Sequence, residues 1–152
     1  MSRVGLASDE AGAALRARVA EHLRGHGHEV LDSGVDDGSR AYPSIAFEVA
    51  ENIRDGVYPR AILICGTGIG VAIAANKVPG VYAATCHDTY SAQRARKSNN
   101  AQVLTMGARV VGPELALAIV DAWIESEFEG GRSTAKVDEL VAGERRYAQA
   151  DQ

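Results

Sequence analysis

The sequence predicts an α/β protein with a Rossmann-like three-layer sandwich, in which helices flank a five-stranded parallel sheet. Short apolar runs alternate with longer amphipathic stretches from one end of the chain to the other, the pattern of parallel strands joined by crossover helices. The length of 152 residues suits one domain, which can bury a core without disulfides or a structural metal. No repeat, low-complexity tract or linker divides the chain, so we expect a single domain over residues 1–152.

The first half of the chain contains three short apolar runs, which we interpret as strands separated by two helices. Both helices are predicted from apolar residues that recur every four positions. The stretch 33–41 between them is rich in Gly, Asp and Ser and is expected to be a loop. The expected strands are 3–8, 29–32 and 61–65; the apolar helix positions are Leu15, Val19 and Leu23, then Ile45, Val49 and Ile53, with the second helix starting after Tyr42 and Pro43.

The second half continues the same alternation and ends in a less apolar helix. We expect helices at 71–77 and 89–97, strands at 81–86 and 102–106, and a long helix through Leu115, Ile119 and Trp123. The tail at 133–147 favours a helix, but its clear apolar contacts are only Val137, Leu140 and Val141. These are too few for a fully buried helix, so we expect the tail to pack on a second subunit.

Composition and charge limit the functions that are open to the chain. With 46% hydrophobic and 24% charged residues, it has the composition of an ordinary soluble globular protein. Its net charge of -4 gives no sign of a nucleic-acid partner, and an anionic ligand would need a few locally placed cations and amides. We find no signal-like N-terminus and no apolar run of about 18 residues, so we expect a cytoplasmic protein with no membrane partner.

A glycine-rich loop follows the third expected strand. Ligands of open α/β sheets bind beyond the carboxyl ends of the strands, and the stretch Gly66–Gly70 lies there, directly after Cys65. Its three glycines let the backbone come close to a ligand and turn several N–H groups toward a phosphate or an enediolate oxygen. The loop matches neither nucleotide motif, because a dinucleotide fingerprint needs glycine at Val71 and a Walker loop needs Lys-Ser/Thr, whereas Lys77 stands alone. The alternative is a tight strand-to-helix turn without a ligand.

The chain has two cysteines, and two are no disulfide framework. Cys65 ends a strand and faces a helix N-terminus and several amides, which favours thiolate character and a role as a base. The alternative for Cys65 is a small buried hydrophobe. That alternative has more weight for Cys86, at the end of the neighbouring strand.

Taken together, several motifs resemble the family of type B ribose-5-phosphate isomerases and galactose-6-phosphate isomerases. The resemblance extends from Val4 to about Val137 and so covers nearly the whole chain. The residues that carry it are 64–70, 74–77, 90–93, Asn99, 107–112 and 129–132, with Asp9 after the first strand and the Tyr42-Pro43 pair.

The resemblance implies an aldose–ketose isomerase that works through a cis-enediolate, as a dimer or tetramer with the active site between two subunits. It also implies that no metal or organic cofactor is used. In the implied catalytic set, Cys65 moves the proton between C1 and C2 and Thr67 assists proton transfer at the oxygens. Asp9 is the third residue of this catalytic set. The amides of Gly66, Gly68, Ile69 and Gly70 would hold the enediolate, and Arg109, Arg132 and Lys136 would bind the phosphate. The expected substrate contacts are Asn99, Ser98, His87 and Tyr42.

Three positions depart from the family pattern. Glu10 and Ser98 stand where the family has histidines that act on the substrate, and Lys136 replaces the second arginine of an Arg-x-x-x-Arg pair. Lysine keeps the charge but loses the forked guanidinium. The histidine replaced by Ser98 is associated with opening the furanose ring, and a serine hydroxyl does not titrate near neutrality.

A four-carbon substrate would make that loss understandable. A tetrose 4-phosphate has its O4 esterified and cannot close a five-membered ring, so D-erythrulose 4-phosphate and D-erythrose 4-phosphate are the preferred substrate pair. The rival is ribose 5-phosphate and ribulose 5-phosphate, with His87 replacing the lost imidazole. A different class, a non-catalytic sugar-phosphate-binding subunit, is disfavoured because Cys65 and Thr67 are both present.

Overall fold

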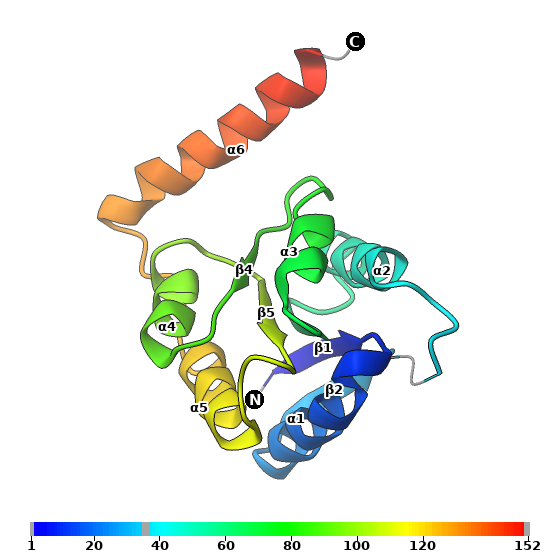
Figure 1. Ribbon diagram of the computed structural model, residues 1–152. Coiled ribbons are helices and arrows are strands. Elements are labelled where there is room, and N and C mark those ends of the chain that lie inside the picture. Colours follow the sequence, from blue (N-terminus) through cyan, green and yellow to red (C-terminus); the bar gives the residue numbers. More distant parts are fainter. Residues whose placement is uncertain (1, 35–36, 151–152) are drawn as a thin grey trace.

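The computed structural model describes residues 2–34 and 37–150, and it contains the predicted parallel sheet. Neighbouring strands run in the order β2-β1-β3-β5-β4, and each pair is parallel. Figure 1 shows the sheet in the centre of the molecule with helices on both sides. The strands are β1 (Arg3–Ser8), β2 (Glu29–Asp32), β3 (Arg60–Cys65), β4 (Ala83–Thr85) and β5 (Val103–Gly107).

The helices form the two outer layers, which confirms the Rossmann-like three-layer sandwich. Buried residues of α1, α4 and α5 share a core with one face of the sheet, and those of α2 and α3 share a core with the other face. The helices are α1 (Ala13–Gly25), α2 (Tyr42–Arg54), α3 (Ile69–Ala75), α4 (Thr89–Lys97), α5 (Pro113–Ile124) and α6 (Arg132–Ala150), with a 3-10 turn, η1, at Glu10–Gly12.

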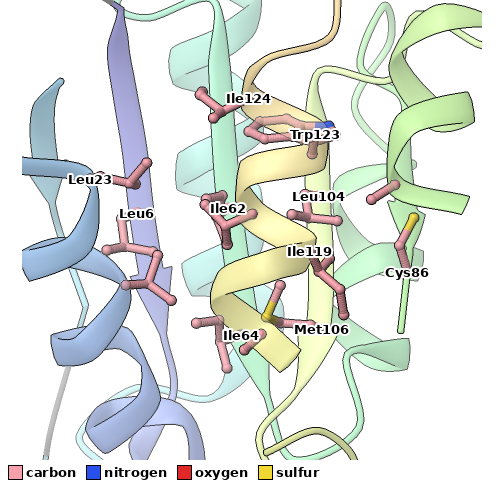
Figure 2. Close-up of a cluster of buried hydrophobic side chains, with 14 of the residues drawn as sticks. Leu6, Leu23, Ile62, Ile64, Cys86, Leu104, Met106, Ile119, Trp123 and Ile124 are labelled. Carbon is pink, nitrogen blue, oxygen red and sulfur yellow. The ribbon is translucent and has the colours of Figure 1, made fainter. Parts of the chain in front are cut away.

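Two apolar cores lie on opposite faces of the sheet because successive side chains of a strand point to opposite sides. Figure 2 shows one of them, in which Ile62 and Leu104 pack against Trp123 of α5. On the other face, Leu63 packs in a cluster with Val49 of α2. Both faces are apolar, as a parallel sheet covered by helices requires.

Several expected boundaries need correction. The helix expected at 71–77 begins at Ile69, because Gly68 already turns the chain with a φ of 79°. The second helix includes Tyr42 and Pro43, since proline fits the first helical turn. The strand expected at 81–86 has only three residues, because β4 lies at the border of the sheet and pairs with β5 alone.

The C-terminal helix α6 extends away from the body of the molecule (Figure 1). Val137 is buried, whereas Leu140 and Tyr147 are exposed. A groove of about 680 Å³ runs along this helix and is lined by Tyr82, Lys136, Leu140 and Tyr147 among others. No helix in the described part of the chain is long and apolar enough to cross a membrane.

Candidate active site

The carboxyl ends of β1, β3 and β5 meet, and we call this region, with residues 9–10, 65–70 and 107–109, the carboxyl end of the sheet. Register places Ser8 opposite Ile64 and Cys65 opposite Gly107. The loops that follow these strands therefore start side by side. This brings Asp9, the glycine-rich loop and Arg109 together, as expected from the sequence.

Cys65 lies beneath the glycine-rich loop with its sulfur held by a backbone amide. The residue is 5% exposed, and the N–H of Gly68 donates a hydrogen bond to Sγ at 3.1 Å. The cysteine therefore faces an amide of the glycine-rich loop, as the sequence indicated, and its role as a base stays a prediction.

Cys86 has a different environment, although it also follows a strand. It is 2% exposed within the apolar cluster of Figure 2, and Sγ lies 3.8 Å from the Ala84 carbonyl. Burial, with a smaller contribution from Asp88, raises the pKa of Cys86 to about 11. At neutral pH Cys86 is therefore a protonated core residue, which agrees with its interpretation from the sequence as a small buried hydrophobe.

The glycines of the loop allow close approaches that a side chain would block. A Cβ at position 68 would lie 2.7 Å from the Met106 carbonyl carbon, and one at position 70 would lie 2.4 Å from the Tyr42 ring. The first-turn amides of α3 lack acceptors within the helix; that of Ile69 donates to Oγ1 of the exposed Thr67 at 3.3 Å. The loop therefore places a thiol, a hydroxyl and amide donors within a few residues.

Two threonines that the sequence analysis missed anchor this loop. Oγ1 of the fully buried Thr105 donates to the Gly68 carbonyl at 2.7 Å. Oγ1 of Thr85 lies 2.8 Å from that of Thr105 and 3.1 Å from the same carbonyl. The one available signal was a polar residue in the otherwise apolar β5.

Beside the loop is an open cavity of about 540 Å³ whose charged lining comprises Asp9, Glu10, Arg40 and Arg109, together with Tyr42. One oxygen of Asp9 caps η1 by accepting from the Gly12 amide at 3.2 Å. The Arg109 guanidinium lies over the loop, 3.2 Å from where a Cβ of Gly66 would be.

Arg40, which sequence analysis did not single out, pairs with Glu48 at 2.6 Å. Because Glu48 already pairs with Arg40, Arg109 is the cavity arginine that remains for an anion, and the structure gives no role to Glu10.

His87 also lies at the carboxyl end of the sheet. Its Nε2 accepts a hydrogen bond from the Gly107 amide at 2.9 Å. A neutral imidazole whose Nε2 accepts must carry its proton on Nδ1. The backbone therefore occupies the basic nitrogen of His87.

Four expected substrate contacts lie at the other end of the sheet. Ser98 and Asn99 precede the start of β5, about 13 Å along that strand from its carboxyl end at a rise of about 3.3 Å per residue. The linker to α6 lies there too, because the Glu129 amide donates to the Lys97 carbonyl at 3.1 Å. We call this region, which contains Ser98, Asn99, Arg132 and Lys136, the amino end of the sheet. Within one chain the structure does not bring these residues to Cys65.

The geometry suits an enzyme that moves a proton on a carbon next to a carbonyl. A thiol beside backbone amide donors is an arrangement suited to removal of such a proton and to stabilisation of the resulting oxyanion. In residues 2–34 and 37–150, no group of three or more His, Cys, Asp or Glu side chains is arranged to hold a metal ion.

Comparison with known proteins gives the family. A family model described as Ribose/Galactose Isomerase matches residues 4–140, nearly the whole chain. The protein belongs to this family, and it is an aldose–ketose isomerase, in agreement with the resemblance seen in the sequence.

Relatives and solved structures cover the chain almost completely. A D-erythrulose-4-phosphate isomerase of Pectobacterium atrosepticum is 50% identical over 142 residues, which are 92% of this chain and 93% of that protein. A ribose-5-P isomerase B of Listeria innocua is 49% identical over 90% of this chain and 93% of its own. The structure of ribose-5-phosphate isomerase B from Clostridium thermocellum has a TM-score of 0.92 at 43% identity and covers 95% of this chain and 99% of that one.

Proposed function

We propose that this isomerase interconverts D-erythrulose 4-phosphate and D-erythrose 4-phosphate, in the cytoplasm, at a site shared by two copies of the chain. The observation that carries the chemistry is the hydrogen bond from the Gly68 amide to the buried Cys65 sulfur. The four-carbon substrate is supported by the missing ring-opening base. Ser98 does not titrate, and the Gly107 amide occupies Nε2 of His87.

The reaction is a proton transfer in two halves. The Cys65 thiolate removes a proton from C1 of the ketose, and the electron pair moves to O2 to give a cis-enediolate. Amides of residues 66–70 hold the developing charge, each contributing about 3 kcal/mol in such sites. Thr67 moves the remaining hydroxyl proton from O1 to O2, and the Cys65 thiol returns its proton to C2 as the C1 aldehyde forms.

Two copies of the chain are needed for the phosphate. In one chain Arg109 lies beside Cys65, whereas Arg132 and Lys136 lie at the opposite end of the sheet. A second copy that docks through the groove along α6 would present its Arg132 to this site. We therefore propose a homodimer, or a tetramer built from such dimers, in which Arg109 of one copy and Arg132 and Lys136 of the other bind the phosphate, with Asn99 beside them.

Ribose 5-phosphate and ribulose 5-phosphate are the second candidate pair. The position of His87 favours them, because this imidazole lies at the same end of the sheet as Cys65. A relative 49% identical to the chain is a ribose-5-P isomerase B. Ring opening by His87 would require its Nε2 to leave the Gly107 amide.

Initial rates on D-erythrulose 4-phosphate and D-ribulose 5-phosphate, measured side by side, test the proposal. Faster turnover of the four-carbon substrate is expected, with Cys65→Ala inactive on both. A clear preference for the pentose phosphate would contradict the proposed substrate and direct attention to His87. Undiminished turnover by Cys65→Ala would contradict the proposed base.

A further inference from the structure

Ser98 is engaged by a single arginine in a way that determines which hydrogen bonds it can still make. Arg94, one helical turn earlier on α4, donates to Ser98 Oγ from Nε at 2.9 Å and from Nη2 at 2.5 Å. A serine hydroxyl has two lone pairs and one hydrogen. The fork of the guanidinium uses both lone pairs, so the hydroxyl hydrogen is what remains.

That hydrogen has no acceptor in the part of the chain that the structure describes. Across residues 2–34 and 37–150, no group accepts a hydrogen bond from the Ser98 hydroxyl. Ser98 is only partly buried and the next residue, Asn99, is exposed. Among the described residues the hydroxyl is therefore a donor that is open to an acceptor from solvent or from a bound ligand.

The rest of the amino end of the sheet also offers donors. Glu129, on the linker to α6, pairs with Nη1 of Arg94 at 3.4 Å, and Arg132 follows three residues later. Arg132 and Lys136 are exposed cations on the first turns of α6, and Asn99 adds an amide donor. Donors with positive charge suit an anionic oxygen, which only accepts.

We propose that Arg94 is a specificity-determining positioning residue: its fork makes Ser98 a donor only, and Ser98 gives its hydrogen to an oxygen of the substrate phosphate. This inference rests on the proposed function, because the phosphate belongs to a substrate whose carbon chain reaches Cys65 of another copy. Arg94 itself acts through Ser98. Ser98 held in this way cannot take a proton from a sugar hydroxyl, which accords with a substrate that needs no ring opening.

A double-mutant cycle on the full-length protein tests the coupling between the two residues. The variants are Arg94→Leu, Ser98→Ala and the double variant, and the probes are KM for the sugar phosphate and the Kd of inorganic phosphate from calorimetry. Loss of one such hydrogen bond predicts a rise of about tenfold in both constants for Ser98→Ala, with kcat little changed. Arg94→Leu should raise both about fivefold, and the double variant should match Ser98→Ala alone.

Controls separate this role from a structural one. Arg94→Lys supplies one nitrogen in place of the two that form the fork and should recover part of the loss. Glu129→Gln removes only the ion pair of Arg94 and should change KM less than twofold. If the fold-increases in KM and Kd of the two single variants multiplied in the double variant, Arg94 would act independently of Ser98, and the inference would be overturned. If the wild type turned over neither sugar phosphate, the proposed function would fail. The phosphate affinities of the four proteins would then decide the coupling between Arg94 and Ser98 on their own.

Discussion

The two ends of the parallel sheet carry different kinds of functional group. At the carboxyl end, backbone groups and buried side chains build the site. The Gly68 amide donates a hydrogen bond to the Cys65 sulfur, and the Thr105 hydroxyl donates one to the Gly68 carbonyl. At the amino end the groups are exposed side chains, Asn99, Arg132 and Lys136 among them, on a helix terminus and a linker.

Under the proposed mechanism, this difference explains why neither end would be an active site alone. The carboxyl end has the proposed base and the amide donors, and its cavity is lined by Asp9, Glu10, Arg40 and Arg109. The four residues named at the amino end, Ser98, Asn99, Arg132 and Lys136, include two cations but no imidazole, thiol or carboxylate that could move a proton. Proton transfer needs rigid placement to within a fraction of an ångström, whereas phosphate can be bound by longer, mobile side chains. The two requirements are met by different parts of the fold.

The largest effect is expected from the two cysteines. Cys65→Ala should lower kcat by about 10²- to 10⁴-fold, the usual contribution of a general base. Cys86→Ala is the matched control, because it removes a buried thiol after the neighbouring strand, and it should leave kcat within about twofold. Steady-state kinetics on both variants measures the difference. Comparable losses in the two would remove the distinction between a reactive and a structural thiol.

The next effect concerns the amino end. Arg132→Ala should raise KM about 10- to 100-fold, equivalent to one charge-assisted bond of about 1.5–3 kcal/mol, and lower kcat much less. Arg24→Ala, which removes an exposed arginine of α1, should change neither constant. A KM that stays at the wild-type value in Arg132→Ala would exclude Arg132 from the phosphate site.

A smaller effect is expected from the loop anchor. Thr105→Val keeps the shape of the side chain but leaves the Gly68 carbonyl without its 2.7 Å donor. We expect about 1–2 kcal/mol less free energy of unfolding and a kcat about tenfold lower, because the loop amides shift. Thr105→Ser retains the hydroxyl and should behave like the wild type. Equal behaviour of the two variants in denaturation and kinetics would mean that the hydroxyl does not anchor the loop.

The smallest effect concerns pH. Burial raises the pKa of Cys86 from 9.0 to about 11, so the folded state keeps this proton at pH values where the unfolded chain has lost it. The contribution of the Cys86 thiol to the free energy of unfolding is complete below pH 9 and is lost as the pH rises toward about 11. Denaturation curves between pH 8 and 11 should show the wild type losing about 1–2 kcal/mol more than Cys86→Ala. Parallel pH profiles would contradict a raised pKa of Cys86 in the folded protein.

The sequence predicted the fold well because local patterns carry it. The strands at 3–8 and 29–32 and the helix at 89–97 have the predicted bounds, since apolar periodicity and flanking turn residues mark both ends. The start of α3 was wrong by two residues because the left-handed turn at Gly68 depends on contact with Met106 of another strand. Local sequence does not predict such contacts between elements that are far apart along the chain.

The site was predicted in part for the same reason. The thiol and its glycine loop form one continuous segment, so their proximity follows from the chain. The roles of Thr105 and Arg40 depend on partners from other elements, Gly68 and Glu48 respectively. At the amino end Asn99 and Arg132 matched family motifs, whereas Ser98 and Lys136 departed from them. The distance of these residues from Cys65 became visible only with the strands in register.

A hybrid-enzyme experiment tests the shared site most directly. Cys65→Ala chains and Arg132→Ala chains are mixed, unfolded and refolded together, and assayed against each variant alone at substrate concentrations well below the wild-type KM. If each site takes Cys65 from one copy and Arg132 from the other, half of the dimers are hybrids with one intact site in two, so activity returns to about one quarter of the wild-type value. If both residues act within the same chain, every hybrid site lacks one of them. Activity then stays at the mean of the two separate variants, and the account of a site built from opposite ends of two sheets is wrong.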